Sequence, residues 1–166
     1  MGTEQSTSFE YGSTQRNHWV SGTVAGLASG LVFGVLLQSI GMMPTIASLY
    51  GGESVLVGWV AHMFHSVVFA LGFVAALQRG PFAKYDGSLV PTLLLAIGYG
   101  LLLWVFGAAI VMPAWLSVVT TASPAIPVIN TQSLVGHVVY GIVLGAVYPV
   151  AAGAVDILPR RGEQAT

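Results

Sequence analysis

Four long apolar runs dominate the pattern of hydrophobic and polar positions along this chain. They cover residues 19–40, 55–77, 89–112 and 133–155, and none of them contains Asp, Glu, Lys or Arg. The hydrocarbon core of a bilayer is ~30 Å thick, and an α-helix needs ~20 apolar residues to cross it. Each run reaches that length, so the pattern predicts an all-α integral membrane protein that folds as a four-helix bundle.

Polar tails flank this transmembrane region. We place the four-span domain at residues 18–155, a polar N-terminal tail at 1–17 and a polar C-terminal tail at 156–166. The N-terminal tail is rich in Ser, Thr, Gln and Glu, which is typical of a disordered or interfacial segment. Because the tail is long and the first apolar run exceeds the ~7–15 residues of a signal sequence, we expect the first span to be retained.

The basic residues predict how the chain is oriented. All five would lie on one side of a membrane that is crossed four times, and the other two loops contain no Lys or Arg. Cytoplasmic segments next to membrane spans carry the excess of Lys and Arg. We therefore expect a protein of the cell membrane with both termini and the middle loop in the cytoplasm. The five residues are Arg16, Arg79, Lys84, Arg160 and Arg161.

The two halves of the chain, at about residues 19–78 and 89–153, resemble each other. In the first span of each half a Gly-led apolar stretch precedes a Met-Pro pair, at Met43-Pro44 and Met112-Pro113, and we expect these prolines to end their helices. The second span of each half carries the pattern small-His-x-x-(His or Tyr)-small. An even number of spans per half predicts two helical hairpins arranged as parallel repeats, related by an axis along the membrane normal.

Glycines recur every four residues on the first span and return on the fourth. This spacing places them on one helix face, where two backbones can approach closely. Small residues of this kind let helices associate in lipid, where no hydrophobic force acts between them. We expect helix packing at these positions, and a substrate path along the groove is the alternative. The residues are Gly22, Gly26, Gly30, Gly34, Gly141 and Gly145.

Three histidines are the only ionisable side chains within the spans, apart from tyrosines. His62 and His65 share a face of the second span, and His137 and Tyr140 share a face of the fourth. Ionisable residues in a membrane usually face the bundle interior, so we expect the two faces to meet. Three interpretations stay open: hydrogen bonds between helices, a metal or haem site, and a proton or substrate site. His18, at the start of the first span, is expected to be a solvated flank.

The sequence lacks the features of several functional classes. No Asp or Glu lies within a span, which argues against a carboxylate proton relay, and no Lys or Arg lies there to hold an anion. There is no cysteine for a disulfide, a thiolate metal site or a nucleophile. P-loop, G-x-S-x-G and H-E-x-x-H motifs are missing, and a net charge of −1 gives no basic patch for a nucleic acid. The sequence therefore does not predict an enzyme.

Two segments carry a resemblance to a known group. They are Trp104-Val-Phe-Gly-Ala-Ala-Ile-Val-Met-Pro-Ala-Trp-Leu116 and Leu134-Val-Gly-His-Val-Val-Tyr-Gly-Ile-Val-Leu-Gly-Ala-Val-Tyr148. With them, most of residues 19–153 resembles small four-span membrane proteins of halophilic archaea. The resemblance implies the fold and the membrane location but no activity. Members of that group are sometimes labelled histidine kinases. This chain has no room for a nucleotide-binding domain, and a histidine inside the membrane cannot accept a phosphate in the cytoplasm.

These observations favour a non-enzymatic multi-pass membrane protein that serves as a structural or accessory component of a membrane assembly. Its partners would be the lipid bilayer and further subunits, in a homo- or hetero-oligomer. Two alternatives stay open. One is a redox subunit that binds haem or a metal through the intramembrane histidines, and the other is a small transporter that acts as an oligomer.

Overall fold

Helices account for all the regular secondary structure in the described part of this protein. The computed structural model describes the backbone of residues 4–157 and the side chains of residues 18–154, and it contains no strand in that part of the chain. The elements in order are α1 (Glu4–Ser39), α2 (Met43–Ser48), α3 (Val55–Leu77), the 3₁₀-helix η1 (Gly80–Tyr85), α4 (Leu89–Leu102), the π-helix η2 (Leu103–Val111), α5 (Met112–Val119) and α6 (Thr131–Ile157).

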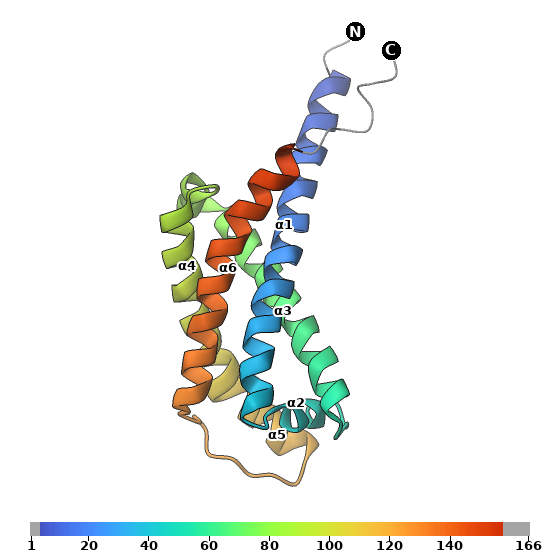
Figure 1. Cartoon of the computed structure of the whole chain (residues 1–166), viewed down its shortest axis with the longest axis vertical. Coiled ribbons are helices and arrows are strands. Elements are labelled where there is room, and N and C mark those ends of the chain that lie inside the picture. The colour runs from blue at the N-terminus through green and yellow to red at the C-terminus, as the bar shows by residue number, and fades with distance from the viewer. Residues whose placement is uncertain (1–3, 158–166) are drawn as a thin grey trace.

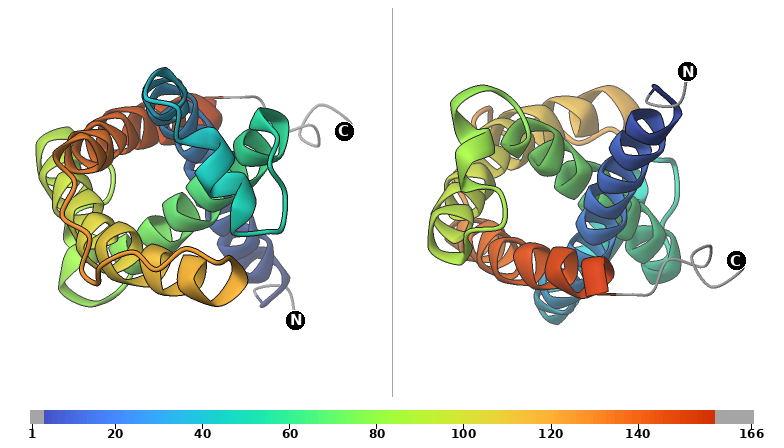
Figure 2. Two further views of the ribbon diagram at one scale, coloured as in Figure 1. Left: turned by 90° about the horizontal axis from the view of Figure 1, so that it is seen from below. Right: turned by 90° about the horizontal axis from the view of Figure 1, so that it is seen from above.

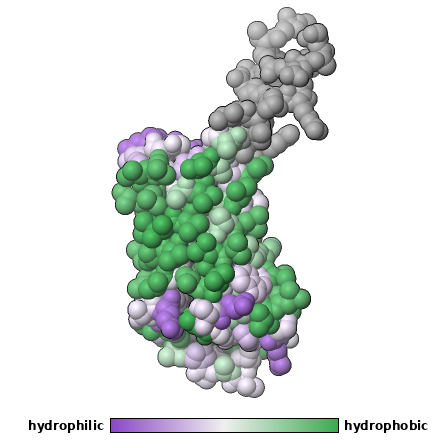
Figure 3. Space-filling model, in the orientation of Figure 1, coloured by the Kyte–Doolittle hydropathy of each residue, from purple (hydrophilic) through white to green (hydrophobic). Residues whose placement is uncertain are grey.

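Four of the helical stretches are long and apolar enough to cross a membrane. They are His18–Ser39, Val55–Leu77, Leu89–Val119 and Thr131–Ala154. Large apolar side chains on these helices are exposed, and Figure 3 shows them as a broad hydrophobic band with polar residues above and below it. Such a surface suits contact with lipid tails. The prediction of an all-α, four-span membrane protein is confirmed.

The spans begin and end at recognisable local signals. The hydroxyl of Ser54 accepts a 3.2 Å hydrogen bond from the backbone N–H of Val57 at the start of α3. The side-chain oxygen of Asn130 accepts a 2.9 Å bond from the N–H of Ser133 at the start of α6. These caps satisfy backbone donors that a helix start leaves unpaired. The helix of the first span extends back to Glu4, through the segment predicted as a polar tail. The side chains of Arg16, Arg160 and Arg161 lie outside the described residues.

The four long helices form a ring (Figure 2). Helix α1 packs against α3 and α6, and α6 also packs against α4. The N-terminal end of α1 and the C-terminal end of α6 lie at the same end of the bundle as η1, which we call the η1 end (Figure 1). Helices α2 and α5 lie at the opposite end, which we call the α2/α5 end. Each half of the chain thus contains a long helix, a short helix at the α2/α5 end and a returning helix.

The glycines of α1 face α3. A Cβ added at Gly26 would stand 2.8 Å from the Cβ of Ala70, and one added at Gly30 would stand 2.6 Å from the Cβ of Ser66. At the α1–α3 interface Gly22 faces Val74 and Gly34 faces Trp59. These distances are shorter than carbon atoms in contact allow, so the two helices approach at a separation that only glycine permits.

A second close approach joins α6 to α4. An added Cβ would stand 2.5 Å from the carbonyl oxygen of Ala96 at Gly141, and 2.6 Å from the Cα of Leu93 at Gly145. Here the opposing atoms belong to the backbone of α4, which cannot rotate away. The glycines of the first and fourth spans therefore sit at the two hairpin interfaces, α1 with α3 and α4 with α6.

The third span does not end at Pro113, contrary to the sequence prediction. The helix passes through η2, a nine-residue π-helix, and continues as α5 to Val119. Pro113 occupies the first turn of α5, where its missing N–H is tolerated. The change from π- to α-geometry at Met112 gives the proline this position. Pro44 lies in the first turn of α2, after α1 has already ended at Ser39.

The η1-side half of the bundle is filled by a close-packed core. Its buried side chains come from α3 and α6 and include Phe73, Val74, Leu77, Leu144 and Tyr148. Dense packing of this kind leaves no room for a small molecule. The space inside the bundle lies in the other half.

Candidate functional site

A cavity of about 360 Å³ occupies the α2/α5-side half of the bundle. All four spans contribute to its wall, and α2, α5 and the segment before α6 close its α2/α5 end. Most of the lining is apolar, with side chains such as Phe33, Leu37, Ile46, Leu103 and Val111. The wall also carries a small set of polar side chains, and these include all four of the residues that the sequence singled out.

The structure brings His62, His65, His137 and Tyr140 to this one cavity. The first two come from α3 and the others from α6, so the two polar faces meet inside the bundle. His62 is 6% exposed and Tyr140 is 3% exposed, which shows that both are held within the protein and not presented to lipid. Polar side chains inside a membrane protein are expected to point this way.

His62 is fixed by the backbone of α1. Its Nε2 lies 2.9 Å from the carbonyl oxygen of Gly30. A carbonyl can only accept, so Nε2 carries the hydrogen and donates it. Gly30 allows this contact because its missing side chain lets α3 approach α1.

His137 is fixed by its own helix. Its Nδ1 lies 2.8 Å from the carbonyl oxygen of Ser133, one turn earlier in α6. By the same reasoning Nδ1 carries the hydrogen of the neutral ring, and Nε2 keeps a free lone pair.

Phe33 of α1 contacts both imidazole rings. Its ring centroid lies 5.4 Å from that of His62 and 4.9 Å from that of His137, with the rings edge to face. This geometry suits aromatic contacts. At this point of the cavity wall the two histidines are connected through the ring of Phe33, which contacts each of them.

Tyr140 links α6 to α3, two helices that do not pack closely on each other. Its hydroxyl donates a 2.6 Å hydrogen bond to the backbone carbonyl of Ser66 on α3. The hydroxyl of Ser66 in turn donates a 2.8 Å bond to the carbonyl of His62. The polar hydrogens of both side chains are therefore directed to backbone oxygens.

His65 forms part of the rim at the α2/α5 end. Its Nε2 lies 2.5 Å from the hydroxyl of Tyr50, in the turn after α2. The ring of Tyr50 lies 5.4 Å from that of Trp115 on α5, edge to face. This row of three rings connects the two halves of the chain beside the cavity.

One side of the ring of helices is held together loosely. Within the described residues, α3 packs closely on α1 and α2 but not on α4 or η2. Tyr99 of α4 bridges this side with a 2.9 Å hydrogen bond to the carbonyl of Phe69. His65 and Phe69 of α3 and Gly107 of η2 all line the cavity. A Cβ added at Gly107 would meet no atom within 4 Å.

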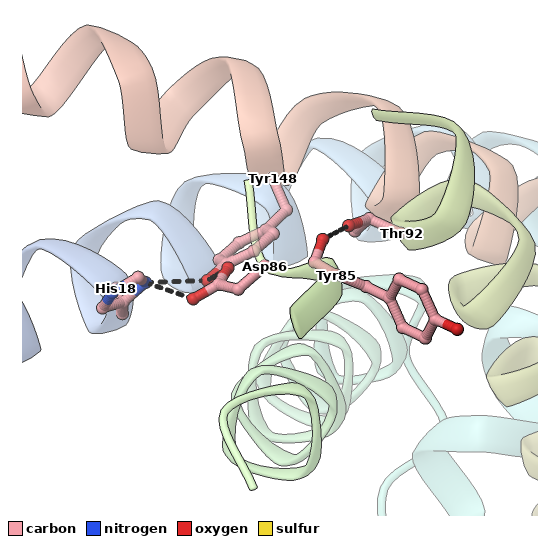
Figure 4. Close-up of polar contacts among 5 residues, drawn as sticks. All are labelled: His18, Tyr85, Asp86, Thr92 and Tyr148. Carbon is pink, nitrogen blue, oxygen red and sulfur yellow. Dashed lines mark hydrogen bonds and ion pairs between the residues drawn. The ribbon is translucent and has the colours of Figure 1, made fainter. Parts of the chain in front are cut away.

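A second polar cluster, at the η1 end, differs from the sequence prediction (Figure 4). His18 is not a solvated flank: its side chain is 23% exposed, its Nδ1 lies 2.9 Å from the hydroxyl of Tyr148, and an oxygen of Asp86 lies 3.5 Å away. Tyr148 also donates a 3.0 Å bond to Asp86. Next to the cluster, Thr92 donates a 2.9 Å bond to the carbonyl of Tyr85.

This cluster could have been anticipated from the predicted orientation. That orientation places the start of the first span, the middle loop and the end of the fourth span on one side of the membrane. Polar residues at the three positions were therefore candidates for contact. The cluster ties α1, the segment after η1 and α6 together at the end opposite the cavity.

Within the part of the chain that the structure describes, no three His, Asp or Glu side chains are placed to hold a metal ion. No protein-family model, curated protein or solved structure matches this chain. The interpretation of the site therefore rests on its own geometry.

Proposed function

We propose that this protein is a non-enzymatic membrane component that binds a small lipid-soluble molecule in the cavity between its spans. The observation that carries the proposal is the cavity itself. Its volume of about 360 Å³ falls within the ~300–1,000 Å³ of small-molecule sites. Such sites combine mainly apolar walls with a few converging polar groups, and this cavity has that composition.

The loose side of the bundle supports entry from the bilayer. Helix α3 does not pack closely on η2, and the cavity is lined by Phe69 of α3 and Gly107 of η2. A molecule dissolved in lipid would approach at this side without crossing a polar surface. The wide turns of η2 and the missing side chain of Gly107 leave room beside this approach.

For the orientation we propose both termini in the cytoplasm. Arg79 and Lys84 lie at the η1 end, together with the start of α1 and the end of α6. The positive-inside rule then assigns the η1 end to the cytoplasm and the cavity to the outer half of the membrane. The parallel repeat, the oligomeric state and the likeness to archaeal four-span proteins stay part of this proposal.

The two alternative functions have less support. A haem held between His62 and His137 would have to displace Phe33, which contacts both rings. A transporter needs a path to the other side of the membrane, and the η1-side half is filled by side chains such as Phe73, Leu144 and Tyr148. A binding site requires neither the displacement of Phe33 nor a path through the packed half of the bundle.

A fluorescence titration with a brominated alkylphenol tests the proposal, because bromine quenches tryptophan on contact and Trp115 lines the cavity. We expect saturable quenching in the wild type and loss of that component in Trp115→Phe. Gly107→Phe adds a large ring at the wall of the cavity, so it should weaken binding at least tenfold. The matched control is Gly98→Phe, since an added Cβ at Gly98 also meets nothing within 4 Å but Gly98 does not line the cavity. Linear, unsaturable quenching, or equal affinity in all variants, would refute the proposal.

A further inference from the structure

The polar side chains in the middle of the cavity present hydrogen-bond acceptors, because their own hydrogens are already donated to backbone carbonyls. The N–H of His62 is given to Gly30, and the N–H of His137 is given to Ser133. The hydroxyl hydrogens of Tyr140 and Ser66 are likewise given to backbone carbonyls. The remaining donors of the lining lie toward the α2/α5 end, on α2, α5, the rim of α3 and the start of α6. They belong to Thr45, His65, Trp115, Asn130 and Ser133.

His137 keeps the most accessible acceptor. Its Nε2 forms no hydrogen bond with a described residue. It is also not among the side-chain polar atoms that are fully buried without a partner. The side chain borders the cavity, so the lone pair of Nε2 is open to a molecule placed there. The second ring nitrogen of His62, Nδ1, likewise forms no hydrogen bond with a described residue and is not among these fully buried atoms.

We propose that the cavity selects a ligand that donates a hydrogen bond, namely a lipid-soluble phenol or alcohol whose hydroxyl binds Nε2 of His137. This inference rests on the proposed function and names the chemistry of its ligand. A ketone, ester or ether of the same shape would place an acceptor oxygen next to Nε2 of His137, which is itself an acceptor. At this position the oxygen would lose its hydrogen bonds to water and gain none, which is unfavourable inside a protein.

The test compares 4-hexylphenol with its methyl ether, 4-hexylanisole, as competitors of the brominated probe. We expect the wild type to prefer the phenol on the order of tenfold, the factor that corresponds to ~1.4 kcal/mol for one buried hydrogen bond. His137→Phe keeps a planar ring and removes the acceptor, so it should bring the preference close to one. Tyr85→Phe alters a ring outside the cavity and should keep the full preference.

The outcomes separate the two proposals. If neither competitor displaces the probe and the probe does not saturate, the binding function fails and this inference fails with it. If both competitors bind the wild type equally, or if the preference survives in His137→Phe, only the inference about the donor is wrong.

A measurement on the wild type alone covers the case that His137→Phe does not fold. In ¹⁵N-histidine spectra, the phenol should shift the signal of an unprotonated ring nitrogen and the ether should not. Equal shifts with both compounds would overturn the inference.

Discussion

The hydroxyl of Tyr140 on α6 lies 2.6 Å from the backbone carbonyl oxygen of Ser66 on α3, and this hydrogen bond crosses the interior of the bundle. In the ring of spans, α1 and α4 separate these two helices, which do not pack closely on each other. The bond therefore joins diagonal helices at the inner boundary of the cavity, where the close-packed half of the bundle begins. We expect it to hold α3 and α6 at a fixed separation as well as to contribute to stability.

Tyr140→Phe should destabilise the protein by about 0.6–2 kcal/mol, because it removes one buried hydrogen bond between helices. Thermal unfolding in detergent would show the loss as a lower Tm. Tyr85→Phe is the control, since the hydroxyl of Tyr85 has no bonded partner among the described residues. Equal effects of the two changes would mean that the 2.6 Å bond is not formed in solution.

Gly26→Ala should destabilise the protein although it adds only one methyl group. The new methyl group would stand 2.8 Å from the Cβ of Ala70 and 3.0 Å from the Cα of Val67, so α1 and α3 would have to separate. Overpacking of this kind costs about 1–3 kcal/mol. Gly98→Ala introduces the same atom at a helix position where nothing lies within 4 Å, and it should leave the Tm unchanged or raise it. A Gly26→Ala protein as stable as Gly98→Ala would show that this face does not pack against α3.

Asp86→Ala should release the segment between α3 and α4. Asp86 accepts from Tyr148 and lies near His18, so its loss removes the contacts that tie this segment to α6 and α1. Trypsin should then cut faster after Arg79 or Lys84, both of which are exposed. Asp86→Asn keeps an oxygen that can accept from Tyr148 and should restore most of the resistance. The same cutting rate in wild type and Asp86→Ala would argue against the cluster.

Cysteine labelling tests the proposed orientation, and the chain has no native cysteine to interfere. Ser123 and Lys84 are both exposed and lie at opposite ends of the bundle. A membrane-impermeant maleimide added to intact cells should modify Ser123→Cys at once. It should modify Lys84→Cys only after the membrane is opened. The opposite pattern would place the cavity in the cytoplasmic half of the membrane.

The sequence was sufficient to predict the spans, because their length and lack of charge follow from the thickness of the bilayer. The meeting of the histidine faces was also predictable, since a membrane leaves few places for an imidazole other than the bundle interior. The same reasoning places His62 and His137 inside the bundle without any knowledge of the helix order.

Other features depended on the tertiary structure. The π-helix at Leu103–Val111 could not be predicted, because its residues are as apolar as those of an ordinary span. Pro113 was expected to end a helix, and only the change in helical geometry before it explains why it does not. The cavity itself arises because α3 and η2 stay apart, and no local pattern records the distance between two helices. The partners of His18 lie more than 60 residues away in the chain, on Asp86 and Tyr148.

A crystal structure with the brominated alkylphenol bound, recorded at the bromine absorption edge, would show directly whether the cavity holds a ligand. We expect an anomalous peak inside the cavity, next to Phe33, Gly107 and His137, which all line it. The peak should disappear in Gly107→Phe and stay in Gly98→Phe. Bromine found only on the lipid-facing surface, with no peak in the cavity of the wild type, would contradict the account.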